Sequence, residues 1–323
     1  MEYLLLTVGL GLLLSGANYM VDASVAIAKR ARISNFVIGM TIVGIGTSAP
    51  ELFVGISSAL NGDGDIAMGN VVGSNIANVL LILGVTAAIA PFPIENETQR
   101  RDIPFGIIAT FLMILIANDA LLPGIAENTV SRVDGVFFLV MFVCYMGYVL
   151  LNKARNPGQA EADADAQSSL EGKHPALLWL IAIVSLAALI YGGNLFLDNA
   201  KLLARSWGMS EAVISITIVA VGTSLPELIT AIVAATKNNT QLALGNVLGS
   251  NIFNCLFILG TSATVRPLTV SGISWVDYGV MMSAMLLTYV VAYTFRKKTF
   301  DRVEGFIFLG LYVAYTAYLL VLA

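Results

Sequence analysis

Apolar stretches long enough to cross a lipid bilayer follow one another along the whole chain of 323 residues. A hydrocarbon core of about 30 Å takes a helix of about 20 apolar residues, and only helices and closed barrels satisfy their backbone hydrogen bonds there. With a mean hydropathy of +0.83 and only 12% charged residues, the composition excludes a soluble globular protein. The sequence therefore predicts an all-α polytopic membrane protein with ten transmembrane helices. Their ranges are 3–28, 36–60, 66–91, 103–120, 134–151, 176–200, 211–235, 242–265, 275–295 and 304–322.

A polar segment separates the first five predicted helices from the last five. Residues 152–175 contain the run Ala-Glu-Ala-Asp-Ala-Asp-Ala-Gln-Ser-Ser, which is typical of a flexible linker. Residues 1–151 and 176–323 then form two five-helix halves. When loops are assigned alternately to the two sides, 13 of the 17 lysines and arginines fall on the linker side, and basic residues favour the cytoplasmic face. We expect a multi-pass protein of the cell (inner) membrane with both termini outside and the linker cytoplasmic.

The two halves carry the same motifs at a constant offset of 176 residues. Ile-Gly-Thr-Ser-Ala-Pro-Glu-Leu at 45–52 matches Val-Gly-Thr-Ser-Leu-Pro-Glu-Leu at 221–228. Gly-Asn-Val-Val-Gly-Ser-Asn-Ile-Ala-Asn at 69–78 matches Gly-Asn-Val-Leu-Gly-Ser-Asn-Ile-Phe-Asn at 245–254. Because each half has an odd number of spans, the second half must cross the membrane in the opposite direction to the first. This predicts an inverted-topology repeat, a plan common among secondary transporters.

Glu51 and Glu227 are the equivalent carboxylates of the two repeats, each about 15 residues into a predicted apolar helix. A lone carboxylate at mid-membrane costs several kcal/mol, so it usually faces a water-filled cavity, a partner or a cation. A pseudo-two-fold axis brings equivalent residues toward one point, where the charge of two carboxylates matches one divalent cation. The other interpretation is a structural hydrogen bond between protonated carboxyl groups.

A proline precedes each glutamate, at Pro50 and Pro226. A proline inside a helix removes one amide donor and clashes with the carbonyl four residues back, and lipid offers the freed carbonyl oxygens no partner. A hard cation does, because calcium takes about six to eight oxygen ligands and combines carboxylates with carbonyls. The duplicated motif therefore favours an oxygen-lined cation site over a plain proline kink.

The third and eighth predicted helices offer further oxygens. Ser74 and Asn78 are four residues apart and share one helical face, as do Ser250 and Asn254. Small residues four apart predict that these helices pack closely against the glutamate-bearing ones. The small residues are Gly69, Gly73, Gly245 and Gly249.

Two other equivalent pairs are polar. Asn70 and Asn246 suit interhelical hydrogen bonding and ion coordination equally well. Asp22 and Asp198 lie toward the ends of the first and sixth predicted helices, near lysines in the sequence. We expect end-of-helix or hinge roles for both aspartates.

The residues that usually support enzyme chemistry are few. Cys144 and Cys255 lie in apolar runs without metal-ligand spacing, and we expect both to be core thiols. The single histidine, His174, lies in a polar stretch and is expected to be a solvated loop residue. The formal net charge of −4 gives no basic surface for nucleic acid. We therefore expect no enzyme activity, no catalytic residue, no cofactor, no nucleic-acid partner and no evident protein partner.

The duplicated motifs resemble the alpha repeats of the cation/calcium exchanger superfamily. Over its whole length the chain is similar to the short prokaryotic sodium/calcium exchangers, which are antiporters. This resemblance implies ten helices in two inverted halves, with a central cluster of ion sites for bound Ca²⁺ and Na⁺. It also implies that the first and sixth helices slide across the other eight to alternate access.

The resemblance also implies ligands, position by position. Calcium would be held by the carboxylates of Glu51 and Glu227 and the backbone carbonyls of Thr47 and Thr223. Flanking sodium sites would use side chains and two backbone carbonyls. These are Ser48, Ser74, Ser224 and Ser250, with the carbonyls of Gly44 and Ala220.

One position departs from several members of the superfamily. Several sodium/calcium exchangers, and the potassium-dependent ones, carry an aspartate where this chain has Asn254. Asn78 and Asn254 make the site symmetric here, which leaves the number of sodium ions per calcium and the part played by a proton open. Proton-coupled relatives usually carry an acidic residue soon after Gly-Asn, which Gly69 to Gly73 lacks. This favours sodium as the coupling ion.

The sequence therefore predicts an antiporter that exchanges sodium for calcium across the plasma membrane by alternating access. An alternative keeps the fold but couples calcium, or another divalent cation, to protons. A cation channel with Glu51 and Glu227 as its filter is a further alternative. The inverted repeat argues against a channel, because channels usually surround a pore with like-oriented subunits.

Overall fold

The structure is a computed structural model that describes residues 2–121, 127–153, 168–209, 214, 222–294 and 299–322. Several predictions fall outside these residues: the ligand role of Ala220, the beginning of the seventh predicted helix, and most of the linker 152–175. Four of the basic residues on the linker side also fall outside them, and they are Arg155, Arg296, Lys297 and Lys298.

All long elements of the first half are α-helices, and three short π-helical segments, η1, η2 and η3, lie between them. Its helical elements are α1 (Glu2–Ala31), α2 (Asn35–Ile38), η1 (Gly39–Val43), α3 (Gly44–Thr47), α4 (Ala49–Asn61), α5 (Gly64–Ile76), η2 (Ala77–Leu83), α6 (Gly84–Ile89), η3 (Thr98–Asp102), α7 (Ile103–Ile116), the 3₁₀ turn η4 (Asp119–Leu121) and α8 (Arg132–Lys153).

The second half follows the same plan over its described residues. Its helical elements are α10 (Pro175–Ser206), α13 (Leu225–Thr236), α14 (Thr240–Ile252), the π-helical η6 (Phe253–Ile258), α15 (Leu259–Val265), α16 (Trp275–Thr294) and α17 (Arg302–Leu322). The segments η2 and η6 begin at positions 77 and 253, which differ by the repeat offset of 176. Single π-helical turns often occur at functional sites because they shift side chains out of the regular helical register.

Seven helices among the described residues are long and apolar enough to cross a membrane, and one bent pair of helices brings the number to eight. The bent pair runs over 35–47 and 49–61, with an angle of 46° between its parts. The two remaining predicted spans contain shorter helices, α7 with 14 residues and α13 with 12 residues. The architecture is therefore that of an all-helical, multi-pass membrane protein.

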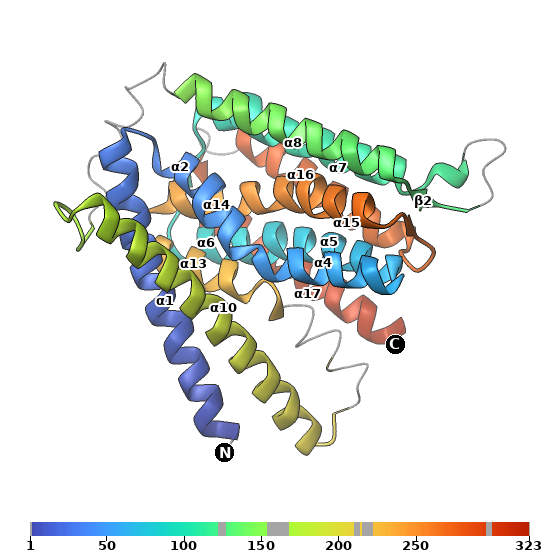
Figure 1. The fold of residues 1–323 in the computed structure, drawn as a ribbon, viewed down its shortest axis with the longest axis horizontal. Helices are drawn as coiled ribbons and strands as arrows, with labels where there is room; N and C mark the ends of the chain where they lie inside the picture. The colour runs from blue at the N-terminus through green and yellow to red at the C-terminus, as the bar shows by residue number, and fades with distance from the viewer. Residues whose placement is uncertain are drawn as a thin grey trace.

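Helices α1 and α10 lie side by side and run at a steep angle to α4, α5 and α15 (Figure 1). Glycines allow their backbones to approach closely. A Cβ at Gly9 would lie 2.7 Å from the backbone nitrogen of Phe196, and one at Gly16 would lie 2.9 Å from the carbonyl oxygen of Ser185. Close packing of small residues is a main source of helix association in membranes. The two long helices therefore form a tightly packed pair.

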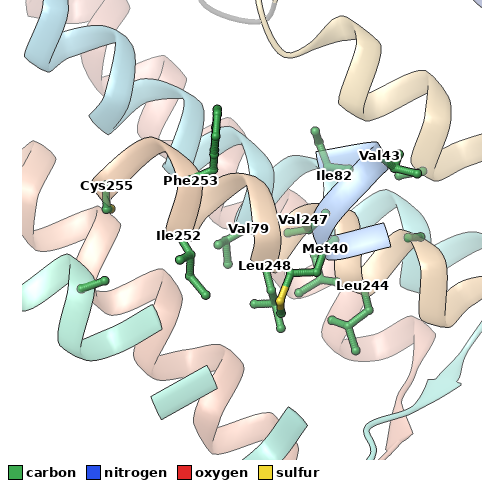
Figure 2. Close-up of a cluster of buried hydrophobic side chains, with 14 of the residues drawn as sticks. Met40, Val43, Val79, Ile82, Leu244, Val247, Leu248, Ile252, Phe253 and Cys255 are labelled. Carbon is green, nitrogen blue, oxygen red and sulfur yellow. The ribbon is translucent and has the colours of Figure 1, made fainter. Parts of the chain in front are cut away.

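Helix α14 lies at the core of the protein. Every residue from Leu242 to Ile252 is buried, and α14 packs against α2 and η1 of the first half. A Cβ at Gly245 would overlap the carbonyl oxygen of Phe36, and one at Gly249 would lie 2.5 Å from the carbonyl oxygen of Met40. The predicted close packing is confirmed for this glycine pair. Figure 2 shows the apolar side chains around this contact, which include Met40, Val43, Val79, Ile82, Leu244, Val247, Leu248 and Ile252.

Two short strand pairs join the halves. β1 (Phe92–Pro93) pairs antiparallel with β4 (Thr299–Phe300), and β2 (Thr129–Val130) pairs antiparallel with β3 (Leu268–Thr269). Each pair therefore takes one strand from each half, so that loops distant in sequence are tied together.

The outward faces of the long helices are apolar, as expected for contact with lipid. Exposed side chains such as Phe53, Val140 and Phe306 lie on α4, α8 and α17. Cys144 is also exposed, whereas Cys255 is buried. The prediction of a core thiol is therefore wrong for Cys144, because an apolar stretch in a membrane helix does not distinguish the lipid-facing side from the core.

Candidate functional site

Both glutamate-bearing segments break just before the glutamate. In the first half the break is at Ser48, and Glu51 lies in the first turn of α4. In the second half Ser224 precedes α13, whose first turn contains Glu227. The predicted helix 36–60 is therefore interrupted at Ser48, 13 residues after it begins at Asn35 in the structure. Most of the seventh predicted helix before Thr223 lies outside the described residues.

Proline explains the breaks. Pro50 and Pro226 occupy the first turn of α4 and α13, where a helix does not need the N–H that proline lacks. A new helix therefore begins at the motif, and its N-terminal end carries the positive side of the helix dipole. This end stabilises negative charge, so both carboxylates lie at a favourable position within an apolar protein.

The two glutamates are linked to the opposite halves by crossed hydrogen bonds. The Ser48 hydroxyl donates to Glu227 Oε1 at 3.0 Å, and the Ser224 hydroxyl donates to Glu51 Oε1 at 3.3 Å. Both glutamates are only 1% exposed. Within the described part of the chain, each Oε1 therefore has a serine of the other half as its partner, and no hydrogen bond joins the two carboxyl groups to each other.

Asn70 and Asn246 make equivalent contacts behind the glutamates. The Asn70 amide donates to the backbone carbonyl of Glu51 at 3.2 Å, and that of Asn246 donates to the carbonyl of Glu227 at 3.5 Å. The Asn246 side-chain oxygen also accepts from the Thr47 hydroxyl at 3.2 Å. Of the two interpretations left open by the sequence, these contacts match interhelical hydrogen bonding.

Asn78 and Asn254 lie in the π-helical segments η2 and η6 and are each 1% exposed. The Asn78 amide donates to the side-chain oxygen of Asn251 at 3.0 Å, and the Asn254 amide donates to that of Asn75 at 3.1 Å. Asn75 and Asn251 were not assigned a role from sequence. Their duplication in the Gly-Ser-Asn-Ile-x-Asn motif was the available signal.

Among the buried side-chain oxygens that lack a hydrogen-bond partner in the described part of the chain, four belong to predicted ligands. They are Glu51 Oε2, Glu227 Oε2, Asn78 Oδ1 and Asn254 Oδ1. A buried polar atom without a partner costs about 1–3 kcal/mol, and more if it is charged. Carboxylate and amide oxygens are ligands that calcium and other hard cations prefer. The four oxygens are therefore suited to a cation, in equivalent pairs from the two halves.

The other predicted ligands lie in the same helices. Thr47, Ser74 and Ser250 are buried, and the Ser250 hydroxyl donates to the backbone carbonyl of Gly44 at 3.3 Å. Thr223 is partly buried at the break before α13. Among the described residues there is no cluster of three or more histidine, cysteine, aspartate or glutamate side chains. A cation here would therefore be held by two carboxylates together with neutral oxygens.

Apolar membrane-length helices that surround buried, unpaired oxygens are typical of proteins that move ions across membranes. The sequence matches the sodium/calcium exchanger protein family over residues 1–151 and 177–321. The chain belongs to this family, which confirms the resemblance seen in the sequence.

Similar proteins span almost the same length. The chain is 35% identical to the putative antiporter CaxA of Alkalimonas amylolytica, over 95% of each chain. It is 32% identical to the sodium/calcium exchanger MaX1 of Methanosarcina acetivorans, over 97% of each chain. A solved structure of the sodium-calcium exchanger NCX_Mj matches with a TM-score of 0.82 and 30% identity, covering 98% of this chain and 97% of that one. These relatives are exchangers or antiporters, so this protein is a transporter of the cation/calcium exchanger type.

Proposed function

We propose that the protein is a secondary active antiporter that exchanges sodium for calcium through a site formed by Glu51, Glu227, Asn78 and Asn254. The four unpaired oxygens of these side chains carry the proposal. Further oxygens complete the proposed ligand set for Ca²⁺ and Na⁺. They come from Thr47, Thr223, Ser48, Ser224, Ser74, Ser250 and the carbonyls of Gly44 and Ala220. The names of the relatives MaX1 and NCX_Mj support sodium as the coupling ion.

Exchange follows from competition in this proposal. Calcium and sodium both take oxygen ligands, and the two glutamates are shared between the sites. Two carboxylates neutralise one calcium ion, so binding calcium together with several sodium ions would leave excess positive charge in a buried region. The site then holds one kind of ion at a time, and each ion must leave before the other crosses.

An inverted repeat of five and five helices accounts for the crossed contacts. Ser48 to Glu227 and Ser224 to Glu51 are equivalent under an exchange of the halves. The pairing of β1 with β4 and of β2 with β3 has the same reciprocal form. In this arrangement α7 and α13 contribute to the fourth and seventh of ten spans. The halves, 1–151 and 176–323, are then two domains joined by the linker 152–175.

The orientation of this arrangement follows from charge. Because most lysines and arginines are on the linker side, that side is cytoplasmic and both termini are outside. Calcium then leaves the cell as sodium enters down its gradient across the cell membrane.

Alternating access requires that, in each state, the protein is closed at one end of α1 and α10 and open at the other. The two equivalent aspartates, Asp22 and Asp198, differ strongly in their contacts and exposure. At the linker end, Asp22 is buried and accepts from Lys237 Nζ at 2.6 Å and from the Ser169 hydroxyl at 2.5 Å. At the other end, the Asp198 side chain is 70% exposed and its ion pair is with Lys201 of the same helix. Lys29, the lysine that is near Asp22 in the sequence, forms its ion pair with Glu171 instead. This asymmetry supports a state closed at the linker end.

Asp22→Asn is expected to increase opening at the linker end by up to about tenfold, because a hydrogen bond to a charged group contributes about 1.5–3 kcal/mol and Lys237 is partly solvated. The measurement is the labelling rate of Ser24→Cys by a membrane-impermeant thiol reagent applied from the linker side, in a chain with Cys144→Ser and Cys255→Ser. Ser24 is fully buried on α1, close to Asp22.

Asp198→Asn is the matched control, since it changes the equivalent aspartate at the other end. It is expected to leave labelling at position 24 unchanged. Equal acceleration by both substitutions, or none by Asp22→Asn, would contradict a closure at the linker end.

The coupling ion is tested by uptake of radiolabelled calcium into proteoliposomes that contain the purified full chain. Vesicles loaded with sodium and diluted into sodium-free buffer are expected to take up calcium, while vesicles with only a pH gradient are not. Uptake driven by pH alone would instead support the proton-coupled alternative. Equal uptake without any gradient would support a channel.

A further inference from the structure

Asn75 and Asn251 hold the amide groups of the proposed ligands Asn254 and Asn78 in one orientation. An asparagine side chain can rotate so that its oxygen and nitrogen exchange places, and only its partners decide between the two orientations. The nitrogen of Asn254 donates to Asn75 Oδ1 at 3.1 Å, and that of Asn78 donates to Asn251 Oδ1 at 3.0 Å. The oxygens of both ligands are therefore the atoms left unpaired.

The contacts behind Asn75 and Asn251 differ in chemistry. Each asparagine nitrogen contacts a methionine sulfur, Met281 at 4.0 Å for Asn75 and Met285 at 3.7 Å for Asn251. The Asn75 nitrogen has in addition the Cys255 sulfur at 2.9 Å. A thiol is both a weak donor and a weak acceptor, but a thioether only accepts. By the repeat offset, the position equivalent to Cys255 is Val79. The two halves are therefore equivalent at the ligand and at its partner, but not one step further out.

We propose that Asn75 and Asn251 are positioning residues that turn the side-chain oxygens of Asn254 and Asn78 toward the ions, and that Cys255 makes position 254, but not position 78, able to accept a third carboxylate. This inference rests on the proposed function, because it concerns the ligands of that site. The inference specifies in which half of a nearly symmetric site an added carboxylate can change the charge of the site. A change in charge would alter the selectivity and stoichiometry of transport.

The physical reason lies in donors and acceptors. An aspartate at position 254 has no N–H to give to Asn75 Oδ1, so the two oxygens repel each other unless Asn75 rotates. Rotation turns its nitrogen toward the new carboxylate and its oxygen toward Cys255, whose S–H can donate. An aspartate at position 78 requires the same of Asn251, but rotation there places an oxygen against the Met285 sulfur, which cannot donate.

The first experiment measures calcium affinity of the purified full chain from the calcium-dependent rise in melting temperature. We expect Asn254→Asp to bind calcium at least as tightly as the unmodified protein. We expect Asn78→Asp to bind calcium at least about tenfold more weakly than Asn254→Asp. The two variants are expected to differ by one hydrogen bond to the new carboxylate, which is a charged group. Equal affinities of the two variants would overturn the proposal.

The second experiment tests the role of the thiol in the Asn254→Asp background. Cys255→Val removes the donor and matches Val79 of the other half, and it is expected to weaken calcium binding by about tenfold or more. Cys255→Ser keeps a donor and is expected to retain the affinity of Asn254→Asp. The same two substitutions in a chain with Asn254 serve as controls for packing. Equal losses from Val and Ser would overturn the role of Cys255.

The positioning role has its own test in the chain with Asn254. Asn75→Asp keeps an acceptor for the Asn254 nitrogen, whereas Asn75→Leu has a similar size and no acceptor. We expect weaker calcium binding for Asn75→Leu than for Asn75→Asp, with similar melting temperatures in the absence of calcium. Equal affinities would overturn it. The proposed function is tested separately, because an unmodified protein whose melting temperature does not respond to calcium or sodium contradicts the site itself.

Discussion

Glu51→Gln and Glu227→Gln are each expected to reduce sodium-dependent calcium uptake by a factor of about 100 or more while leaving a folded protein. Removing one partner of a buried charge pair costs about 3–5 kcal/mol, and every 1.4 kcal/mol is about tenfold in affinity. Glutamine keeps one acceptor for the serine of the other half, so the contacts of Oε1 with Ser48 and Ser224 can persist. The measurement is calcium flux into proteoliposomes, with calcium-dependent melting as a second readout.

Glu304→Gln is the matched control for both variants. Glu304 is 4% exposed and lies at the beginning of α17, where its Oε2 accepts from the backbone of Asp301. The substitution removes a buried carboxylate away from the proposed site, and calcium uptake is expected to stay close to that of the unmodified protein. Normal uptake by either Glu51→Gln or Glu227→Gln would falsify the central site. Equal losses from all three variants would indicate a general effect of buried charge.

The second large effect is expected for Gly245→Ala, which should lower the free energy of unfolding by about 3 kcal/mol because it overpacks the protein core. The new methyl group would overlap the carbonyl oxygen of Phe36 and lie 3.0 Å from the backbone nitrogen of Met40. Both are backbone atoms, which cannot move aside as a side-chain end can. The measurement is the melting temperature of the detergent-solubilised protein, together with the fraction that elutes as a single species in size-exclusion chromatography.

Gly11→Ala is the control for this prediction, since a Cβ at Gly11 meets no atom within 4 Å. Gly11 is exposed on α1, and alanine at a compatible helical position is neutral or stabilises a protein by about 0.4–1 kcal/mol. A melting temperature for Gly245→Ala equal to that of Gly11→Ala would contradict the close contact of α14 with α2 and η1.

The helical plan of the chain was largely predictable because hydropathy acts locally. Predicted ranges such as 242–265 and 275–295 agree within about two residues with 240–265 and 275–294 in the structure. The break between helices at Ser48 was harder to predict from the sequence. Pro50 predicted a disturbed helix, but a kinked helix and two separate helices have the same sequence signal. Only the surrounding contacts decide between them, including the bond from Ser48 to Glu227 of the other half.

The residue types of the candidate site were predictable from the sequence, but the hydrogen bonds that connect them were predicted only in part. Duplication singled out the glutamates, serines and asparagines, and their assignment as ligands stays a prediction. The roles of Asn75 and Asn251 were not found, because an asparagine that binds a ligand side chain and one that binds an ion look alike in sequence. The partner of Asp22 was also missed, since Lys237 is distant in sequence and Lys29 is near.

The sequence by itself determined that this chain is an all-helical membrane protein of the sodium/calcium exchanger family, with two related halves and a pair of buried carboxylates. These properties follow from the length, apolarity and repetition of individual segments. Only the tertiary structure decided which oxygens are left unpaired, which serine meets which glutamate, and why Asp22 is buried while Asp198 is exposed. Such contacts join residues more than 170 positions apart, for example Ser48 with Glu227, and they arise from packing between helices rather than from any local pattern.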